Sequence, residues 1–220
     1  MFVKNFMQTD VLTVSSDDSI YDALKLLKDH NFRRMPVVDN GKLIGIVTRK
    51  AIREASPSKA TSLSVHELNY LLSKMCVADV MKKNVITTTG DTPIEEAGLT
   101  MHRKQIGGLP VMEGDKMVGY ISSNDLFRAI VMINGLDKPI ARIIVAVKPD
   151  GWQDAVSKCS EIIKSTGCEF KMMSLMRTED ENKRHLIMRF KSPNGLDPTI
   201  SAIKQAGFDV VSVLENIKLV

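Results

Sequence analysis

The sequence has no hydrophobic run that could span a membrane, and it does not open on a signal peptide. A spanning helix needs about 20 consecutive apolar residues, and no run in the 220 residues approaches that length. Residues Met1 to Phe6 lack the apolar core and the small-residue cleavage site of a secretory signal. The 44% hydrophobic and 25% charged residues are typical of an ordinary globular protein. We therefore expect a cytoplasmic location and no membrane partner.

Cysteine and histidine are scarce, with three and four residues respectively. Cys76, Cys159 and Cys168 are odd in number and show no Cys-x-x-Cys or metal-like spacing, so reduced thiols are favoured over disulfide bridges. Cys159 is expected in the core. The histidines share no metal-ligand spacing with one another or with cysteine. The sequence therefore predicts no metal site.

The sequence also lacks the short motifs that carry catalysis. There is no Gly-x-Ser-x-Gly, no Walker A run and no His-Glu-x-x-His, and no cysteine has an evident base near it in sequence. We predict that the protein is not an enzyme, with no catalytic residues and no catalytic cofactor. An enzyme remains the alternative that a nucleotide-hydrolysis assay would test.

Aromatic residues make up only 5% of the chain, and the basic residues are scattered along it. The net charge of +4 attracts polyanions weakly, but no aromatic stacking platform for bases is indicated. Small phosphates fit this balance better than nucleic acid, which the sequence disfavours as a partner.

The first two thirds of the chain contain an internal repeat at a constant offset of 74 residues, the spacing of Met7 and Met81. A register kept without a gap is not expected by chance, and a repeat fixes the architecture. The matching pairs include Val11 and Val85, Thr13 and Thr87, Asp17 and Asp91, Pro36 and Pro110, and Gly45 and Gly119.

Each copy is predicted to fold in the order β-α-β-β-α. Turn residues at Asp39-Asn40-Gly41 and Glu113-Gly114-Asp115 indicate a hairpin in each copy. Because each copy is too small to bury its own faces, we expect a pseudo-symmetric pair with a cleft between the copies. The predicted elements are strands at 11–14 and 85–88, helices containing 20–27 and 94–101, hairpin strands at 35–38, 43–47, 109–112 and 117–121, and final helices from Lys50 and Asn124.

A connector interrupts the repeat at residues 56–76. Its Ser-Pro-Ser-Lys start breaks the preceding helix, and Ser64 with Glu67 forms the pattern of a capping box. We therefore expect a separate helix in this connector.

The pattern changes after Asn134-Gly135, with a boundary predicted at 136–139. The periodicity of the C-terminal segment predicts the order βαββαβ, a ferredoxin-like unit that hosts many functions. The predicted strands are 143–147, 169–178, 185–191 and 210–214, and the predicted helices are 152–165 and 197–205.

The repeated motifs resemble those of CBS domains. They are Val-x-x-x-Met at Val3–Met7 and Val77–Met81, Pro-Val-Val-Asp from Pro36, and the Gly-x-x-Ser-x-x-Asp run from Gly119. With the C-terminal unit, the chain resembles the AcuB-type acetoin-utilisation proteins, which join a CBS pair to an ACT domain. The resemblance implies an α+β fold with CBS domains at 1–55 and 77–135, the connector at 56–76, and an ACT-like domain at 139–220.

The resemblance also implies one adenine-nucleotide site (AMP, ADP or ATP as regulatory ligand). In that family Ser122 and Asp125 would hold ribose and phosphate with Tyr120 and Asn124 alongside, Arg33, Arg34 and Lys50 would bind phosphates, and Val11 and Leu12 would cradle adenine. Two plainer interpretations stay open: Asp125 as a helix cap, and the arginines as solvated hairpin-edge residues.

The pseudo-symmetric site departs from the family pattern. Ala51 stands in place of the ribose carboxylate, and Gly107 and Gly108 stand in place of the two arginines. Since each charge-assisted bond contributes about 1.5–3 kcal/mol, we predict one nucleotide per chain. In the ACT-like unit the family's effector loop falls at 149–152 without the usual spacing, so dimerisation is as plausible there as amino-acid binding.

The function that this resemblance implies is a regulatory sensor. Ligand in the CBS cleft would shift the arrangement of a homodimer, acting on a regulated enzyme or protein partner. The alternatives are an adaptor with vestigial sites and a sensor of S-adenosylmethionine.

Overall fold

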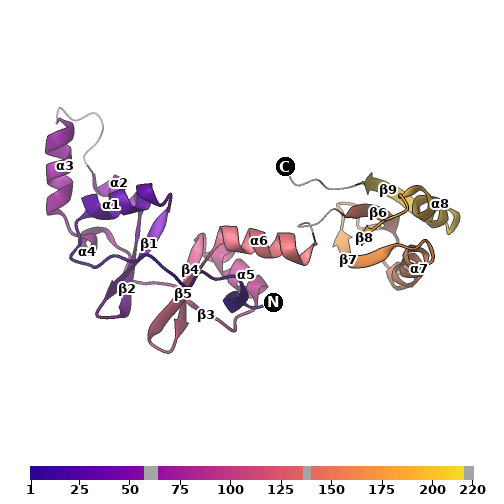
Figure 1. Cartoon of the computed structure of the whole chain (residues 1–220), viewed down its shortest axis with the longest axis horizontal. Coiled ribbons are helices and arrows are strands. Elements are labelled where there is room, and N and C mark those ends of the chain that lie inside the picture. The colour runs from indigo at the N-terminus through magenta and orange to yellow at the C-terminus, as the bar shows by residue number, and fades with distance from the viewer. Residues whose placement is uncertain (57–63, 136–139, 216–220) are drawn as a thin grey trace. The chain divides into compact units, whose positions relative to one another are not determined.

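The computed structural model describes residues 1–56, 64–135 and 140–215 (Figure 1). The chain divides into two compact units, Met1–Phe127 and Arg128–Val220. The first holds both repeats, and the second holds the predicted βαββαβ unit. The breaker at 57–59 and the boundary predicted at 136–139 lie outside the described residues, so the limits predicted for the domains stay predictions.

The first unit is built on one five-stranded sheet in the order β1-β2-β5-β4-β3. Its two hairpins meet where Lys42 of β2 pairs with Lys116 of β5. Asn40 and Gly41 turn the first hairpin with φ of 50° and 76°, which a two-residue type I′ turn requires. The elements are η1 (Val3–Asn5), α1 (Ile20–Asp29), β1 (Arg34–Asp39), β2 (Lys42–Thr48), α2 (Arg49–Ala55), α3 (Val65–Lys74), α4 (Val77–Val80), β3 (Thr88–Thr89), α5 (Ile94–Lys104), β4 (Gly108–Glu113), β5 (Lys116–Ser122) and α6 (Ser123–Ile133).

The strands predicted at 11–14 and 85–88 are wrong in extent. In the first copy only Val14 pairs, in an isolated bridge with Val37, and in the second β3 covers only Thr88–Thr89. The physical reason is that a β-branched run becomes a strand only where a partner backbone lies beside it, and here the run pairs with the hairpin over only one or two residues. The predicted connector helix is confirmed, with Ser64 and Glu67 in a capping box.

The two repeats exchange their N-terminal arms. Gln8 and Tyr120 donate backbone hydrogen bonds to each other at 2.9 Å, and the equivalent pair, Lys82 and Ile46, does so at 2.9 and 3.0 Å. The arm of each copy therefore pairs with the hairpin of the other, which makes the repeats one folding unit.

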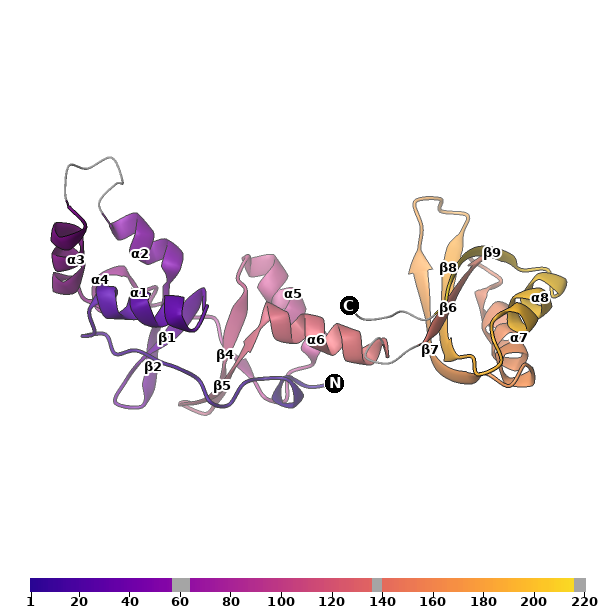
Figure 2. The same cartoon turned by 45° about the horizontal axis from the view of Figure 1, so that its top comes forward.

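The second unit is a four-stranded antiparallel sheet in the order β7-β8-β6-β9. Figure 2 shows α7 and α8 on the same face of this sheet, where Cys159 and Phe190 are fully buried in the core. The predicted βαββαβ order and the core position of Cys159 are confirmed. The assignment to the ACT type stays a prediction. The elements are β6 (Ala141–Val147), α7 (Trp152–Ser165), β7 (Glu169–Arg177), β8 (Arg184–Lys191), α8 (Asp197–Gln205) and β9 (Asp209–Leu214).

Among the described residues, no helix combines the length and the apolar character that a membrane crossing needs. The same residues hold no cluster of histidine, cysteine and acidic side chains that could bind a metal ion.

Candidate ligand-binding site

A cavity of about 730 Å³ lies between the two repeats. Repeat one contributes residues from the edge of its hairpin and from α2, which begins directly after β2. Repeat two contributes residues 82 and 84–86, which follow α4, and residues 104–106 and 108, where α5 joins β4. The cavity is therefore formed only when both copies pack together.

Basic side chains dominate the polar lining of this cavity. Among the described residues that line it, seven are cations and the only carboxylate is that of Glu54. Glu54 pairs with Lys50 at 3.6 Å, but both side chains are largely exposed, so this ion pair neutralises the cavity little. The cavity therefore favours an anion with several charges. The cations are Arg33, Arg34, Arg49, Lys50, Arg53, Lys82 and Lys104.

Apolar side chains line the rest of the cavity. Ile46 and Ala51 come from repeat one, and Val85, Ile86 and Ile106 come from repeat two. Such a surface suits a flat aromatic ring, as in many small-molecule sites that combine apolar walls with a few polar groups. The Thr48 hydroxyl is already engaged, because it accepts a 3.0 Å hydrogen bond from the Ala51 amide as the N-cap of α2.

Gly107 and Gly108 make room for two large side chains beside the cavity. A Cβ on Gly107 would lie 2.8 Å from Nη2 of Arg34, and one on Gly108 would lie 2.6 Å from the Tyr120 ring. Burial raises the pKa of Tyr120 to about 12, and the charge of the nearby Arg34 opposes that rise. The phenolic oxygen makes no hydrogen bond of acceptable geometry with the described residues. The absence of a side chain at Gly107 thus leaves the space that the Arg34 guanidinium occupies.

Ser122 and Asp125 form a compact pair at the start of α6. The Asp125 carboxylate accepts hydrogen bonds from the Ser122 amide at 2.9 Å and from its hydroxyl at 2.6 Å. Asp125 is 5% exposed. The helix-capping interpretation of Asp125 is therefore supported, and its ligand role stays a prediction.

Comparison with known proteins places both repeats in one family. The family model described as the CBS domain matches residues 3–58 and 77–132, which together span half of the chain. The chain belongs to the CBS domain family.

Individual CBS proteins resemble parts of the chain. An uncharacterized protein of Methanocaldococcus jannaschii is 34% identical over 159 residues, 71% of this chain, and the chain spans about half of that relative (54%). A Vibrio cholerae protein provisionally assigned to acetoin utilization (AcuB) is 25% identical with a TM-score of 0.52, covering 62% of this chain and 95% of its own. CBSX2, solved in complex with AMP, is 26% identical with a TM-score of 0.50, covering 60% and 97%.

The cavity of about 730 Å³ with the seven cations, called the basic cavity below, contains three of the nine residues predicted as the site. Arg33, Arg34 and Lys50 line it, whereas the other six do not. Tyr120 lies beside Arg34, and Leu12 packs against the core of repeat one. Val11 is half-buried, Asn124 is exposed, and Ser122 and Asp125 pair with each other.

The cavity lies at Ala51 and Gly108, on the side where the sequence predicts the weaker of the two CBS sites. The sequence analysis missed the apolar wall there. The 74-residue offset could have found it, because Val85 and Ile86 are the counterparts of Val11 and Leu12. The number of nucleotides bound per chain stays a prediction.

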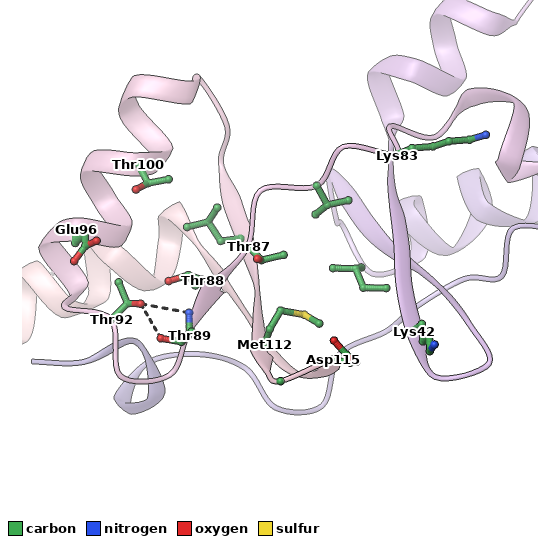
Figure 3. A pocket seen from close by; sticks show the side chains of 14 residues that line it. Lys42, Lys83, Thr87, Thr88, Thr89, Thr92, Glu96, Thr100, Met112 and Asp115 are labelled. Atoms are coloured by element: carbon green, nitrogen blue, oxygen red, sulfur yellow. Dashed lines mark hydrogen bonds between the residues drawn. The ribbon is translucent and has the colours of Figure 1, made fainter.

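A second groove of about 820 Å³ is lined mainly by repeat two, with Lys42 and Leu43 of repeat one at its edge, and Figure 3 shows its threonine-rich wall. Thr88 and Thr100 occupy positions that are Val14 and Leu26 in repeat one, so the groove is more polar than its counterpart. Part of its hydroxyl lining is already satisfied, since Thr89 and Thr92 hydrogen bond to each other at 3.0 Å. No arginine is among the described residues that line this groove, which makes it a poorer phosphate site than the basic cavity.

Proposed function

We propose that the protein is a regulatory sensor whose CBS pair binds an adenine nucleotide in the basic cavity. CBS pairs are regulatory ligand-binding modules rather than catalytic ones, and one similar protein was solved with AMP. The observation that carries the proposal is the combination, in one cavity of about 730 Å³, of an apolar wall with seven cations.

The charge of the cavity favours ADP and ATP over AMP. Each added phosphate brings acceptor oxygens to guanidinium and ammonium groups, and hydrogen bonds between charged partners contribute about 1.5–3 kcal/mol each. Arg33 and Lys82 come from different repeats and lie on the same cavity, so a polyphosphate would join the two copies. Adenine would occupy the wall formed by Val85 and Ile86.

S-adenosylmethionine is the second candidate, and the same charges disfavour it. Its sulfonium and ammonium groups are cationic, so it would bring positive charge to a described lining that has seven cations and one carboxylate. We therefore expect the order of affinity ATP, ADP, AMP and then S-adenosylmethionine.

Ligand binding would act by shifting an equilibrium between two arrangements of a homodimer. Such a shift requires the ligand to bind one arrangement more tightly than the other. The cavity is lined by both repeats of one chain. A small rotation of one repeat changes the separation of its cations, so the ligand binds one arrangement more tightly than the other. A role in acetoin or central carbon metabolism, and a regulated protein partner, belong to the same proposal. The competing proposal is an adaptor whose site is vestigial.

The experiment is a calorimetric titration of the full chain with ATP, ADP, AMP and S-adenosylmethionine, paired with thermal unfolding. Ligand at 100 times its Kd should raise the free energy of unfolding by about 2.7 kcal/mol. Arg33→Gln and Lys82→Gln should each weaken ATP binding about tenfold or more, the equivalent of about 1.4 kcal/mol. Arg103→Gln is the matched control, because Arg103 is exposed and does not line the cavity.

Asp125→Ala tests which side of the CBS pair the nucleotide occupies. Unchanged ATP affinity in this variant, with weakened affinity in Arg33→Gln, would support the basic cavity, whereas loss of binding in Asp125→Ala would place the nucleotide at the Ser122 side. If none of the four ligands binds, the sensor proposal is wrong and the adaptor with a vestigial site is favoured.

A further inference from the structure

The face of the C-terminal sheet that α7 and α8 leave uncovered carries two arginines side by side. Helices α7 and α8 cover the opposite face (Figure 2). Side chains alternate along β6 and β8, so that Arg142 and Arg189 face away from the buried core. The strand register pairs these two residues directly across β6 and β8, which brings their Cβ atoms to within about 4.5–5.5 Å.

Both guanidinium groups lack an acidic partner among the described residues. No described carboxylate lies within ion-pair distance of either arginine, and the Nε atoms of both are buried without a hydrogen-bond acceptor from the same residues. Among the described residues, the side-chain hydrogen-bond acceptor near Arg189 is a thioether, since Nη1 lies 3.6 Å from Sδ of Met172, and sulfur is a weak acceptor. Burial and then the charge of Arg142 lower the pKa of Arg189.

Apolar side chains flank the arginine pair within its own row and in one of the two adjacent rows. In the same cross-strand row Met172 stands beside Arg189 and Leu214 beside Arg142. On one side, the next row of this face has Ile144 opposite Ile187. On the other side, the next row has Lys191 opposite Glu169, whose carboxylate pairs with Lys191 at 3.6 Å and also with Lys171. The apolar neighbours lower the local dielectric, which strengthens both the repulsion between the two arginines and their attraction for an anion.

Two like charges directly opposite each other in a sheet destabilise the pair, and an unsatisfied, half-buried donor adds to that cost. A compact anion with several oxygens removes both terms, because it can accept from both guanidinium forks at once. A second copy of the same face would instead add two more cations. We propose that Arg142 and Arg189 form an oxyanion site, separate from the basic cavity, that binds phosphate or the phosphoryl group of a small metabolite.

The test follows the Nε–Hε NMR signals of the two arginines in the full chain while inorganic phosphate replaces chloride at constant ionic strength. We expect saturable shifts of both signals in the wild type. Arg189→Met should remove the shift at Arg142 and weaken phosphate binding at this site at least tenfold. Because this variant also removes the like-charge contact, it should unfold at the same or a higher temperature than the wild type in phosphate-free buffer.

Arg184→Gln is the matched control on the same strand. Arg184 donates to the backbone carbonyls of Glu181 and Lys183 at 3.0 and 2.8 Å, so it is already satisfied, and its loss should leave the phosphate shifts unchanged. A ribose 5-phosphate titration distinguishes a phosphorylated metabolite from free phosphate, since tighter binding of the ester favours the former. The proposal would be overturned if the shifts grew linearly with phosphate and chloride produced shifts of the same size. It would also be overturned if the Arg142 signal still shifted in Arg189→Met. A third contrary outcome is that an acidic peptide, tetraglutamate, shifts both signals whereas phosphate does not.

These readouts are residue-specific, so phosphate bound in the basic cavity does not imitate them. The nucleotide titration reports on Arg33 and Lys82, in a different unit of the chain. The two proposals therefore fail separately.

Discussion

At the scale of single residues, Gly107 and Gly108 determine where the cleft side chains lie. The pair occupies positions that are Arg33 and Arg34 in repeat one. The absence of side chains there admits Arg34 of repeat one and Tyr120 of repeat two. Repeat two therefore lacks the two arginines of repeat one, and the space beside Gly107 holds the guanidinium of Arg34 instead.

Gly108→Ala is expected to destabilise the CBS pair by about 1–3 kcal/mol, the usual cost of overpacking. Its Cβ would lie 2.6 Å from the Tyr120 ring and 2.9 Å from the Ile121 carbonyl oxygen, which is part of the sheet backbone and cannot move away. Urea unfolding followed by circular dichroism measures the change.

Gly98→Ala is the control for this substitution. Gly98 lies inside α5, and its added Cβ would meet only the flexible end of Leu126 at 3.4 Å. Alanine should stabilise this helix by up to about 1 kcal/mol. Equal destabilisation by both substitutions would contradict the assignment of the effect to the Tyr120 contact.

At the scale of elements, the end of the β1–β2 hairpin is tied to the loop that precedes α1. The Asp39 carboxylate accepts hydrogen bonds from the hydroxyls of Ser16 at 2.5 Å and Ser15 at 2.9 Å, and from the Ser16 amide at 3.0 Å. Repeat two lacks this pair of residues, because Glu113 and Gly90 stand at the positions of Asp39 and Ser16. The tie is therefore specific to repeat one.

These hydrogen bonds, led by that of the Ser16 hydroxyl, lower the pKa of Asp39. A carboxyl group whose pKa is lower in the folded state contributes stability above its unfolded pKa, about 3.9 for aspartate. That contribution is lost as the pH falls through the folded value. Asp39→Asn should therefore destabilise the protein at neutral pH and reduce the fall in stability below about pH 4.

Urea unfolding between about pH 2.5 and pH 7, a range that spans the carboxyl titration, measures this dependence in wild type and Asp39→Asn. Parallel curves, with a constant difference across the whole range, would show that Asp39 does not titrate with folding. Convergence of the curves at low pH is the expected result.

At the scale of the whole molecule, the exchanged arms make the two CBS repeats interdependent. Met7 packs against Gly119, and Met81 packs against Gly45, so each arm occupies space that a missing side chain leaves in the other copy. Backbone hydrogen bonds continue the contact at Gln8 and Tyr120. The packing of each repeat therefore depends on the arm of the other.

Gly119→Val should release the first arm, because a Cβ there would lie 2.8 Å from both the Gln8 carbonyl oxygen and Sδ of Met7. We expect faster hydrogen exchange at the amides of Gln8 and Tyr120, which bond to each other's carbonyl groups in the wild type. The amides of Ile46 and Lys82, which hold the second arm, are the internal control. Unchanged exchange at Gln8 would contradict the arm contact.

Local sequence patterns predicted most elements because their causes are local. The hairpin turn at Asn40-Gly41 and the capping box of Ser64 and Glu67 depend on residues that are neighbours in the chain. The βαββαβ order of the C-terminal unit was predicted in the same way from its periodicity and turns. The strand predicted at 11–14 was wrong because its extent depends on a partner backbone that periodicity does not report.

The sequence by itself determined the repeat and the family, since an offset and a motif are properties of the chain. Only the tertiary structure decided that the basic cavity lies at Ala51 and Gly108, and that the two arginines are directly opposite each other without an acidic partner among the described residues. The reason is that a cavity and a register depend on how separate segments pack, and steric fit between distant residues such as Gly107 and Arg34 sets that packing.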